Sequence, residues 1–159
     1  YGYDDIIGDT LIWTEGQIDK LSCEVAGFNG CVSVPNGAKG KLEFLERCEK
    51  KLEPIKNYTI AVDNDLDGKK LEAELIRRLG PEKCRTVEWP LGCKDANDVL
   101  VKYGSEELKA CLDKATPCPI KGLYEVQDIV EDVLSLYDNG AKGGVDVGWL
   151  SLEKLYSVR

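Results

Sequence analysis

The chain has 159 residues, of which 43% are hydrophobic and 31% charged, and these proportions predict one globular domain with its own core. Its net charge of −8 argues against a nucleic-acid binder with a large basic surface, although bound divalent cations could still reach phosphate. No run approaches the roughly 18 apolar residues of a membrane span, so no membrane partner is expected. The sequence contains no Met, even at position 1, and we expect a piece of a longer protein.

Short apolar or β-branched runs bounded by turn residues predict four strands. They are residues 10–14, 31–34, 58–62 and 84–89. Apolar residues at helical spacing predict helices after these strands. They are residues 17–26, 42–52, 68–79, 95–103 and 105–112. Ile18, Leu21 and Val25 form the apolar stripe of the first helix, and Asp95 or Asn97 is expected to cap the fourth.

The alternation of strands and helices predicts a parallel sheet with helices on both faces. The expected fold is a three-layer, Rossmann-like α/β domain with a four-stranded, mainly parallel sheet, at residues 1–116. Residues 117–159 are expected to hold a C-terminal helix, from about Leu123 to Tyr137, and a flexible glycine-rich linker at 139–148. Ser105 is expected to cap the fifth helix of the domain.

Seven cysteines occur without any histidine and without a C-x-x-C pair, which argues against a zinc site. Several of them fall on apolar helix or strand positions, where Cys behaves as a small hydrophobe. We therefore expect reduced thiols in a cytoplasmic protein.

Acidic residues follow two of the predicted strands. Glu15 follows the first, and Asp63, Asp65 and Asp67 follow the third. If these two strands are neighbours in a parallel sheet, their carboxyl ends bring the acids into one crevice. Carboxylates so close together repel one another unless cations lie between them, and oxygen-only ligands suit Mg²⁺ or Mn²⁺. The sequence therefore predicts a magnesium or manganese site, with solvated turn residues as the alternative.

The run DNDLDG, followed by Glu74, also matches the calcium loop of an EF-hand. An EF-hand needs a helix before its loop, whereas a strand precedes Asp63. Lys70 occupies a loop position that is normally apolar, and the following helix is expected to begin near Gly68 and to carry Glu74 away from the aspartates. We interpret the calcium pattern as accidental.

The stretches around these acids resemble a known family. TEGQIDKLS (14–22) and DNDLDG (63–68) are similar to the signature motifs of the Toprim domain, the magnesium-binding module of DnaG-type primases, topoisomerases and some nucleases. SVPNGA (33–38) and KDANDVL (94–100) resemble phage-type, Twinkle-like DNA primase–helicases. The tail GWLSLEKLYSVR (148–159) resembles the linker that leads into a hexameric helicase in such proteins.

The resemblance implies a role for each candidate residue. Glu15 would act in catalysis, as a general base at the primer 3′ end. The carboxylates that would hold Mg²⁺ or Mn²⁺ are Asp63, Asp65, Asp67 and Asp95. The residues that would support the site are Asp19, Gly16 and Gly68. The lysines that would contact nucleotide phosphates are Lys39, Lys69 and Lys94. Helix capping is the alternative for Asp19 and Asp95, and plain surface is the alternative for the lysines.

The implied function is magnesium-dependent nucleotidyl transfer for RNA primer synthesis on single-stranded DNA. Template and ribonucleotides would bind the parent protein, with a helicase domain further along the same chain in a homo-hexamer, and the fragment alone is expected to be inactive. Two alternatives stay open: a topoisomerase or nuclease that cuts DNA with the same acids, and a non-catalytic module that spaces a helicase. Gln17, where many relatives carry an acid, and the additional Asp67 depart from the primase pattern.

Overall fold

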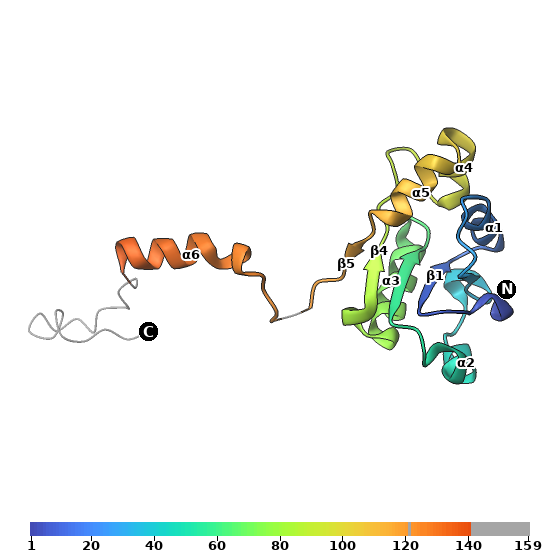
Figure 1. Cartoon of the computed structure of the whole chain (residues 1–159), viewed down its shortest axis with the longest axis horizontal. Helices are drawn as coiled ribbons and strands as arrows, with labels where there is room; N and C mark the ends of the chain where they lie inside the picture. Colours follow the sequence, from blue (N-terminus) through green and yellow to red (C-terminus); the bar gives the residue numbers. More distant parts are fainter. Residues whose placement is uncertain (121, 141–159) are drawn as a thin grey trace, which may run out of the picture. The chain divides into compact units, whose positions relative to one another are not determined.

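The computed structural model describes residues 1–120 and 122–140, without the side chain of Lys39. The chain divides into two compact units, and the first comprises Tyr1–Ile120. The second contains one described helix, α6 (Val126–Asn139), drawn in orange in Figure 1. A capping box between Glu125 and Asp128 begins this helix, which agrees with the predicted C-terminal helix apart from a start three residues later. The predicted linker beyond residue 140, with the helicase-type tail, lies outside the described residues.

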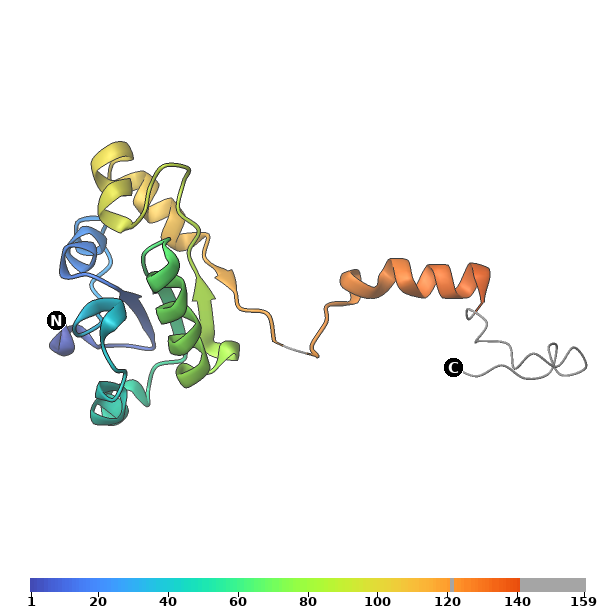
Figure 2. The same ribbon diagram turned by 180° about the vertical axis from the view of Figure 1, so that it is seen from behind.

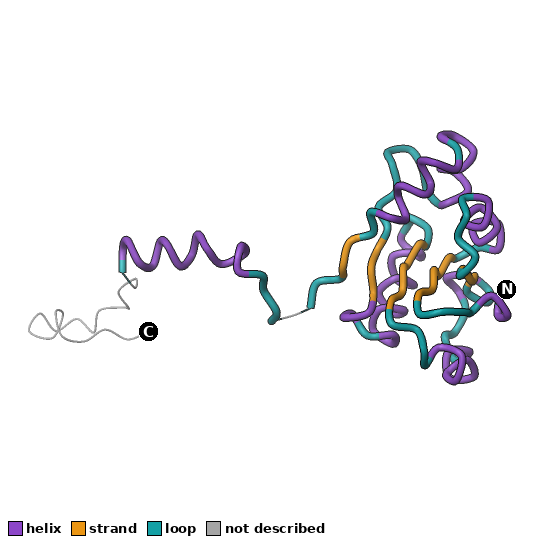
Figure 3. The backbone as a smooth tube through the Cα atoms, in the orientation of Figure 1, coloured by secondary structure: helices purple, strands orange, loops and turns teal. Residues whose placement is uncertain are grey.

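The first unit is built on a single sheet, whose strands run side by side in Figure 3. The strands are β1 (Thr10–Thr14), β2 (Cys31–Ser33), β3 (Asn57–Ala61), β4 (Cys84–Thr86) and β5 (Thr116–Pro117). Their order is β2-β1-β3-β4-β5, with parallel pairing except between β4 and β5. The predicted α/β fold with a mainly parallel sheet is confirmed, with one strand more than the four expected.

The helices of this unit follow the strands in the predicted order. They are α1 (Gln17–Val25), α2 (Phe44–Leu52), α3 (Leu66–Leu79), α4 (Ala96–Tyr103) and α5 (Ser105–Asp113). Three single turns of 3-10 helix accompany them: η1 (Tyr3–Asp5), η2 (Gly37–Lys39) and η3 (Pro81–Lys83). Across the described residues, no helix is both long enough and apolar enough to cross a membrane.

The sheet separates two apolar clusters, which gives the unit its three layers (Figures 1 and 2). Successive residues of β1 point to opposite faces: Leu11 and Trp13 join one cluster and Ile12 joins the other. Helices α2 and α3 cover the first face, for example through the fully buried Leu75. Helices α1, α4 and α5 cover the second, for example through Val99. Buried β1 and β3 therefore form the centre of the fold, with a neighbouring strand on each side.

The fifth strand lies at the point where the predicted α/β domain ends, residue 116. Thr116 and Pro117 pair antiparallel with β4, and the amide of Cys118 donates a hydrogen bond to the Cys84 carbonyl over 3.1 Å. Two residues are too few to show an alternating pattern in the sequence. The proline is tolerated because β5 is an edge strand, where a residue without an N–H does not interrupt the sheet. The fourth strand is correspondingly shorter than predicted and ends at Thr86.

Helix α1 buries a different face from the one that its apolar stripe predicts. Ile18, Leu21 and Val25 are 60%, 40% and 66% exposed, whereas Ser22 and Cys23 are buried. The Ser22 hydroxyl bonds to the Ile18 carbonyl and to Asn97 Oδ1, so polar partners satisfy the inward face. The helical spacing of the apolar residues therefore identifies the helix but not the face that it buries.

Helices α4 and α5 begin with different kinds of N-terminal cap. Asp95 caps α4 as predicted, because its Oδ1 accepts a hydrogen bond from the Asp98 amide over 2.7 Å. Ser105 does not cap α5: it is the first residue of that helix, and Gly104, with φ +88°, occupies the cap position. A glycine with positive φ ends one helix and starts the next without a side-chain cap.

Candidate metal-binding site

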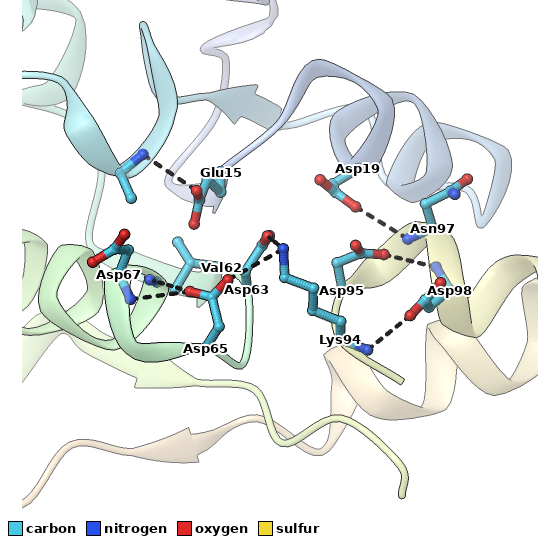
Figure 4. Close-up of polar contacts among 12 residues, drawn as sticks. Glu15, Asp19, Val62, Asp63, Asp65, Asp67, Lys94, Asp95, Asn97 and Asp98 are labelled. Carbon is cyan, nitrogen blue, oxygen red and sulfur yellow. Dashed lines mark hydrogen bonds and ion pairs between the residues drawn. The ribbon is translucent and has the colours of Figure 1, made fainter. Parts of the chain in front are cut away.

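Strands β1 and β3 are direct neighbours, with Thr14 opposite Ala61. The residues that follow them therefore emerge at the same edge of the sheet, and Figure 4 shows Glu15 facing Asp63 and Asp65 across that edge. Glu15 and Asp63 line a hollow of about 380 Å³, together with residues from α1 and from the turn after β2. Of the acids expected to converge after the first and third strands, Glu15 and Asp63 thus line one hollow, with Asp65 beside Asp63, whereas Asp67 is not among the lining residues.

Glu15 has one carboxylate oxygen engaged and one without a partner. Its Oε1 accepts a hydrogen bond from the Ala38 amide over 3.3 Å, in η2. Its Oε2 is buried and has no hydrogen-bond partner in the described part of the chain. Burial, and then the negative charge of Asp63, raise the pKa of Glu15 above its ordinary value. A buried carboxylate oxygen of this kind favours a cation or a proton donor beside it.

Asp63 and Asp65 converge on a single positive charge, the ammonium of Lys94. Lys94 Nζ lies 2.7 Å from Asp63 Oδ2 and 3.2 Å from Asp65 Oδ2. The other oxygen of Asp65, Oδ1, caps α3 by accepting hydrogen bonds from the amides of Asp67 (3.0 Å) and Gly68 (2.8 Å). The Gly68 amide, and then Lys94, lower the pKa of Asp65, so this carboxylate stays ionised.

Glycines allow the backbone to come close at two of the positions expected to support the site. A β-carbon at Gly68 would lie 2.1 Å from the Asp63 carbonyl oxygen, where the first turn of α3 meets the end of β3. A β-carbon at Gly16 would lie 2.7 Å from Asp19 Oδ2. Gly68 therefore excludes a larger side chain, because the atom it would meet belongs to the backbone, whereas at Gly16 the neighbouring atom is the end of the Asp19 side chain, which can move.

Asp19 links the start of α1 to the start of α4. Its Oδ1 accepts a hydrogen bond from the Asn97 amide over 3.1 Å. Burial, opposed by this hydrogen bond and reinforced by the charge of Asp95, raises the pKa of Asp19 to about 6. The sequence indicates Asn97 only as a candidate helix cap. Its hydrogen bond to Asp19 has no local sequence signal, because 78 residues separate Asn97 from Asp19.

Asp67 and Lys69 have partners outside the cluster of Glu15, Asp63 and Asp65. The Asp67 carboxylate pairs with Lys70 over 2.8 Å, and the Lys69 ammonium with Glu72 over 3.1 Å. Lys39 belongs to η2, but its side chain lies outside what the structure describes. Of the two candidate lysines whose side chains the structure describes, Lys94 contacts the acids that follow β3 and Lys69 pairs with Glu72.

The calcium pattern is not supported by the geometry. Glu74 lies in the middle of α3, where its carboxylate binds Arg77 and Arg78 at 2.7 and 2.8 Å. Hydrogen bonds from these two guanidinium groups lower the pKa of Glu74 to about 2. A carboxylate held in this way on the helix surface does not complete a loop around an ion.

The acids fit a divalent cation in kind. Asp63 Oδ2 and Asp65 Oδ2 already approach one shared cationic group, and the buried Glu15 Oε2 beside them is an additional oxygen donor. All three are the hard ligands that Mg²⁺ and Mn²⁺ prefer. Within the described residues, however, no three His, Cys, Asp or Glu side chains come close enough to hold a metal ion by themselves. Water or a substrate would have to supply the remaining ligands.

Residues 12–100 match the protein family described as Toprim-like. The chain belongs to this family. The matched segment begins within β1 and ends within α4, so it contains every acid discussed above. The resemblance to Toprim domains predicted from the two acidic motifs is confirmed.

Two curated plant proteins are similar to this Toprim domain. A Twinkle homolog protein, chloroplastic/mitochondrial, of Arabidopsis thaliana is 39% identical over 180 residues, which cover 99% of this chain and 25% of that protein. A primase homolog protein of the same plant is 38% identical over 141 residues, covering 76% of this chain and 42% of the relative. The chain thus spans less than half the length of either relative.

Solved structures of primases share the fold. One such structure is of the bacteriophage T7 lagging-strand DNA polymerase interacting with primase domains of two gp4 subunits, bound to an RNA/DNA hybrid and dTTP. A chain of that structure aligns with a TM-score of 0.61 at 25% identity, over 69% of this chain and 56% of that one. The RNA polymerase domain of Mycobacterium tuberculosis primase DnaG aligns with a TM-score of 0.57 at 20% identity, over 73% of this chain and 39% of that one. The second likeness concerns the fold alone.

Proposed function

We propose that the first unit is the catalytic Toprim domain of a Twinkle-like DNA primase–helicase, which makes RNA primers on single-stranded DNA by magnesium-dependent nucleotidyl transfer. One observation carries the proposal: Asp63 and Asp65 present two oxygens to one cation, beside the buried and unbonded Glu15 Oε2. The similarity of nearly the whole chain to a Twinkle homolog supports the primase–helicase setting.

The proposed roles follow the positions of the side chains. Asp63 and Asp65 would hold Mg²⁺ or Mn²⁺, and the metal would neutralise the phosphates of an incoming nucleotide. Glu15 would act at the primer 3′ end, where its raised pKa suits a general base. Asp67 and Asp95 are proposed as further ligands. To reach the same ion, Asp67 would have to leave Lys70, and Asp95 would have to leave the Asp98 amide.

Phosphate contacts are proposed for Lys94, Lys69 and Lys39. Lys94 already contacts two of the acids, whereas Lys69 would first have to leave Glu72. Asp19 would keep α1 and α4 in place around the site through Asn97. Gly68 would permit the close approach of the Asp63 backbone, and Gly16 would leave room for the Asp19 carboxylate.

The wider assembly is inferred from the relatives. Single-stranded DNA and ribonucleotides would bind the parent protein, since the T7 assembly named above, which includes primase domains, is bound to an RNA/DNA hybrid and dTTP. A helicase domain in the same chain and a homo-hexamer would complete the enzyme. All seven cysteines, which lie in the described residues, are free, so we infer a compartment that keeps thiols reduced. The cytoplasm meets that condition, and the Arabidopsis relative is named as chloroplastic/mitochondrial.

The test uses the parent protein with single-stranded DNA, ribonucleotides and Mg²⁺. Wild type should make oligoribonucleotides, and Glu15→Gln and Asp63→Asn should abolish them while leaving the ATPase of the helicase unchanged. Synthesis by both variants would overturn the assignment of the site. An active helicase without any primer synthesis in wild type would indicate a non-catalytic module, and cleavage of the DNA would indicate a nuclease or topoisomerase.

A further inference from the structure

We propose that Lys94 is a built-in counter-ion that competes with the metal for Asp63 and Asp65, so that a divalent cation binds these carboxylates by displacing the Lys94 ammonium. The inference rests on the proposed metal-binding role of Asp63 and Asp65. It assigns Lys94 a role that precedes any contact with nucleotide: it sets the affinity of the site for metal.

The competition follows from which oxygens are available. Asp65 uses Oδ1 to begin α3, which leaves Oδ2 for a cation, and Oδ2 is the atom that Lys94 contacts. Lys94 also contacts Oδ2 of Asp63, whose side chain is only 12% exposed. An ion that draws on both aspartates through these oxygens must therefore take the place of the ammonium.

The backbone holds Lys94 in this position independently of its side chain. The Asn64 amide donates a hydrogen bond to the Lys94 carbonyl over 2.8 Å, and the Lys94 amide donates to Asp98 Oδ2 over 3.0 Å. In the same loop, Trp89 Nε1 donates to the Val62 carbonyl over 2.9 Å. The loop after β4 is thus bonded to the loop after β3 on both sides of Asp63. Figure 4 shows the Lys94 side chain between Asp63 and Asp65 and its amide beside Asp98. This arrangement differs from that of a surface lysine on a free loop.

The charges around the site explain why an internal cation is favourable. Glu15, Asp19, Asp63 and Asp65 all lie near this edge of the sheet, and Asp63 raises the pKa of both Glu15 and Asp19 through its negative charge. Lys94 acts in the opposite sense on Glu15 and Asp65. An ammonium within this cluster reduces the repulsion among the carboxylates, and a metal ion would replace that contribution. After displacement, Lys94 stays fastened by its backbone beside the ion, where it can meet a phosphate oxygen.

Lys69 provides a matched control. Its side chain is 51% exposed, as is that of Lys94. Lys69 lies in the first turn of α3, close in sequence to the aspartates, but it pairs with Glu72. A general effect of removing one positive charge would appear equally in Lys69→Met and Lys94→Met. Competition for the two carboxylate oxygens would appear only in Lys94→Met.

The experiment titrates the 159-residue chain with Mn²⁺ in the absence of nucleotide and measures free Mn²⁺ by electron paramagnetic resonance. Lys94→Met should bind Mn²⁺ about five- to tenfold more tightly than wild type, the range expected for losing contacts of a half-exposed ion pair. Lys94→Arg, which retains a cation, and Lys69→Met should stay close to wild type. Any other order, including weaker binding by Lys94→Met or equal gains in both methionine variants, overturns the proposal.

Asp63→Asn separates this proposal from the proposed function. If Asp63→Asn does not weaken Mn²⁺ binding, the assignment of the metal site itself fails. If Asp63→Asn weakens binding while Lys94→Met leaves it unchanged, only the role of Lys94 fails. Circular dichroism of each variant, recorded in EDTA, verifies that the fold is retained, and Lys94→Arg tests the same position with the charge preserved.

Discussion

The Asp19 carboxylate on α1 accepts a hydrogen bond from the backbone amide of Asn97, the second residue of α4, with 3.1 Å between Oδ1 and N. This contact joins two helices that flank the candidate site on the same face of the sheet. It also places a carboxyl group that is only 7% exposed close to Asp63 and Asp95, so the negative charge of Asp19 is unfavourable in the folded state.

Replacing this charge should stabilise the protein at alkaline pH. The pKa of Asp19 is raised to about 6 from 3.8, so the folded state holds this proton more tightly than the unfolded state does. Stability therefore falls as the pH rises from about 4 to 6 and stays lower above that range. Asp19→Asn keeps the oxygen that accepts from Asn97, and should be more stable than wild type at pH 8 by up to roughly 3 kcal/mol.

Urea denaturation in EDTA at pH 8 and pH 4 measures this effect. The difference between Asp19→Asn and wild type should shrink to roughly 0.5 kcal/mol at pH 4, where the Asp19 side chain is protonated in the folded state and partly protonated in the unfolded state. Asp113→Asn, at an exposed position of α5, serves as the control and should change stability by no more than about 0.5 kcal/mol at either pH. A variant Asp19→Asn that is less stable than wild type at pH 8 would contradict the argument.

Gly68→Ala should destabilise the protein, although alanine normally stabilises a helix relative to glycine. The added β-carbon would lie 2.1 Å from the Asp63 carbonyl oxygen, so α3 or the end of β3 would have to shift. We expect a loss of roughly 1–3 kcal/mol in the free energy of unfolding and weaker Mn²⁺ binding through the displaced Asp63. The exposed Lys70→Ala, in the same turn, should stay within about 0.5 kcal/mol of wild type. A stabilised Gly68→Ala variant would show that the close approach is absent.

Metal titration distinguishes the magnesium site from the calcium pattern. Asp65→Asn should abolish binding of Mg²⁺ and Mn²⁺, and it is a clean substitution because asparagine caps a helix as well as aspartate does. Glu74→Gln should have little effect, since Glu74 binds Arg77 and Arg78 away from the aspartates. Isothermal titration with Mg²⁺, Mn²⁺ and Ca²⁺ measures both variants. Tight Ca²⁺ binding that Glu74→Gln destroys would instead support an EF-hand.

The two faces of α1 should respond differently to the same substitution. Leu21 is 40% exposed, and Leu21→Gln should change stability by about 0.5 kcal/mol or less. Cys23 is fully buried, and Cys23→Gln should cost roughly 2 kcal/mol or more, because it places a polar amide in a packed core. Guanidinium denaturation of the 159-residue chain measures both. Similar losses of stability in the two variants would show that the face with Ile18, Leu21 and Val25 is buried as well.

Helix α1 shows why the sequence predicts the helix but not its orientation. Two faces of this helix have helical spacing, one with Ile18, Leu21 and Val25 and the other with Asp19, Ser22 and Cys23. Hydrophobicity favours the first face, whereas the fold buries the second, on which Asp19 and Ser22 both find a partner in Asn97 of α4. This partner is distant in sequence, so the periodicity of the helix contains no information about it.

The site was predictable to the extent that it depends on strand order. Glu15, Asp63 and Asp65 each follow a strand with a clear apolar pattern, and adjacency of β1 and β3 brings them to one edge. The pairing of Lys94 with both aspartates was not predictable, because it depends on the path of the loop after β4. That path is fixed by Trp89 and Asn64, through hydrogen bonds that involve backbone carbonyls. Backbone acceptors have no sequence signature.

The isolated 159-residue chain should make no primer. It contains a candidate metal site, but its net charge of −8 repels the DNA backbone, and bound metal offsets only part of that charge. A gel assay with single-stranded DNA, ribonucleotides and Mg²⁺ tests this, with the parent protein as the positive control. A basic surface loses affinity for DNA steeply as salt rises. Any residual DNA binding by the isolated chain should lack this steep loss, because salt also screens the repulsion between the acidic chain and the DNA. Oligoribonucleotide product from the isolated chain would show that template binding does not require other parts of the parent.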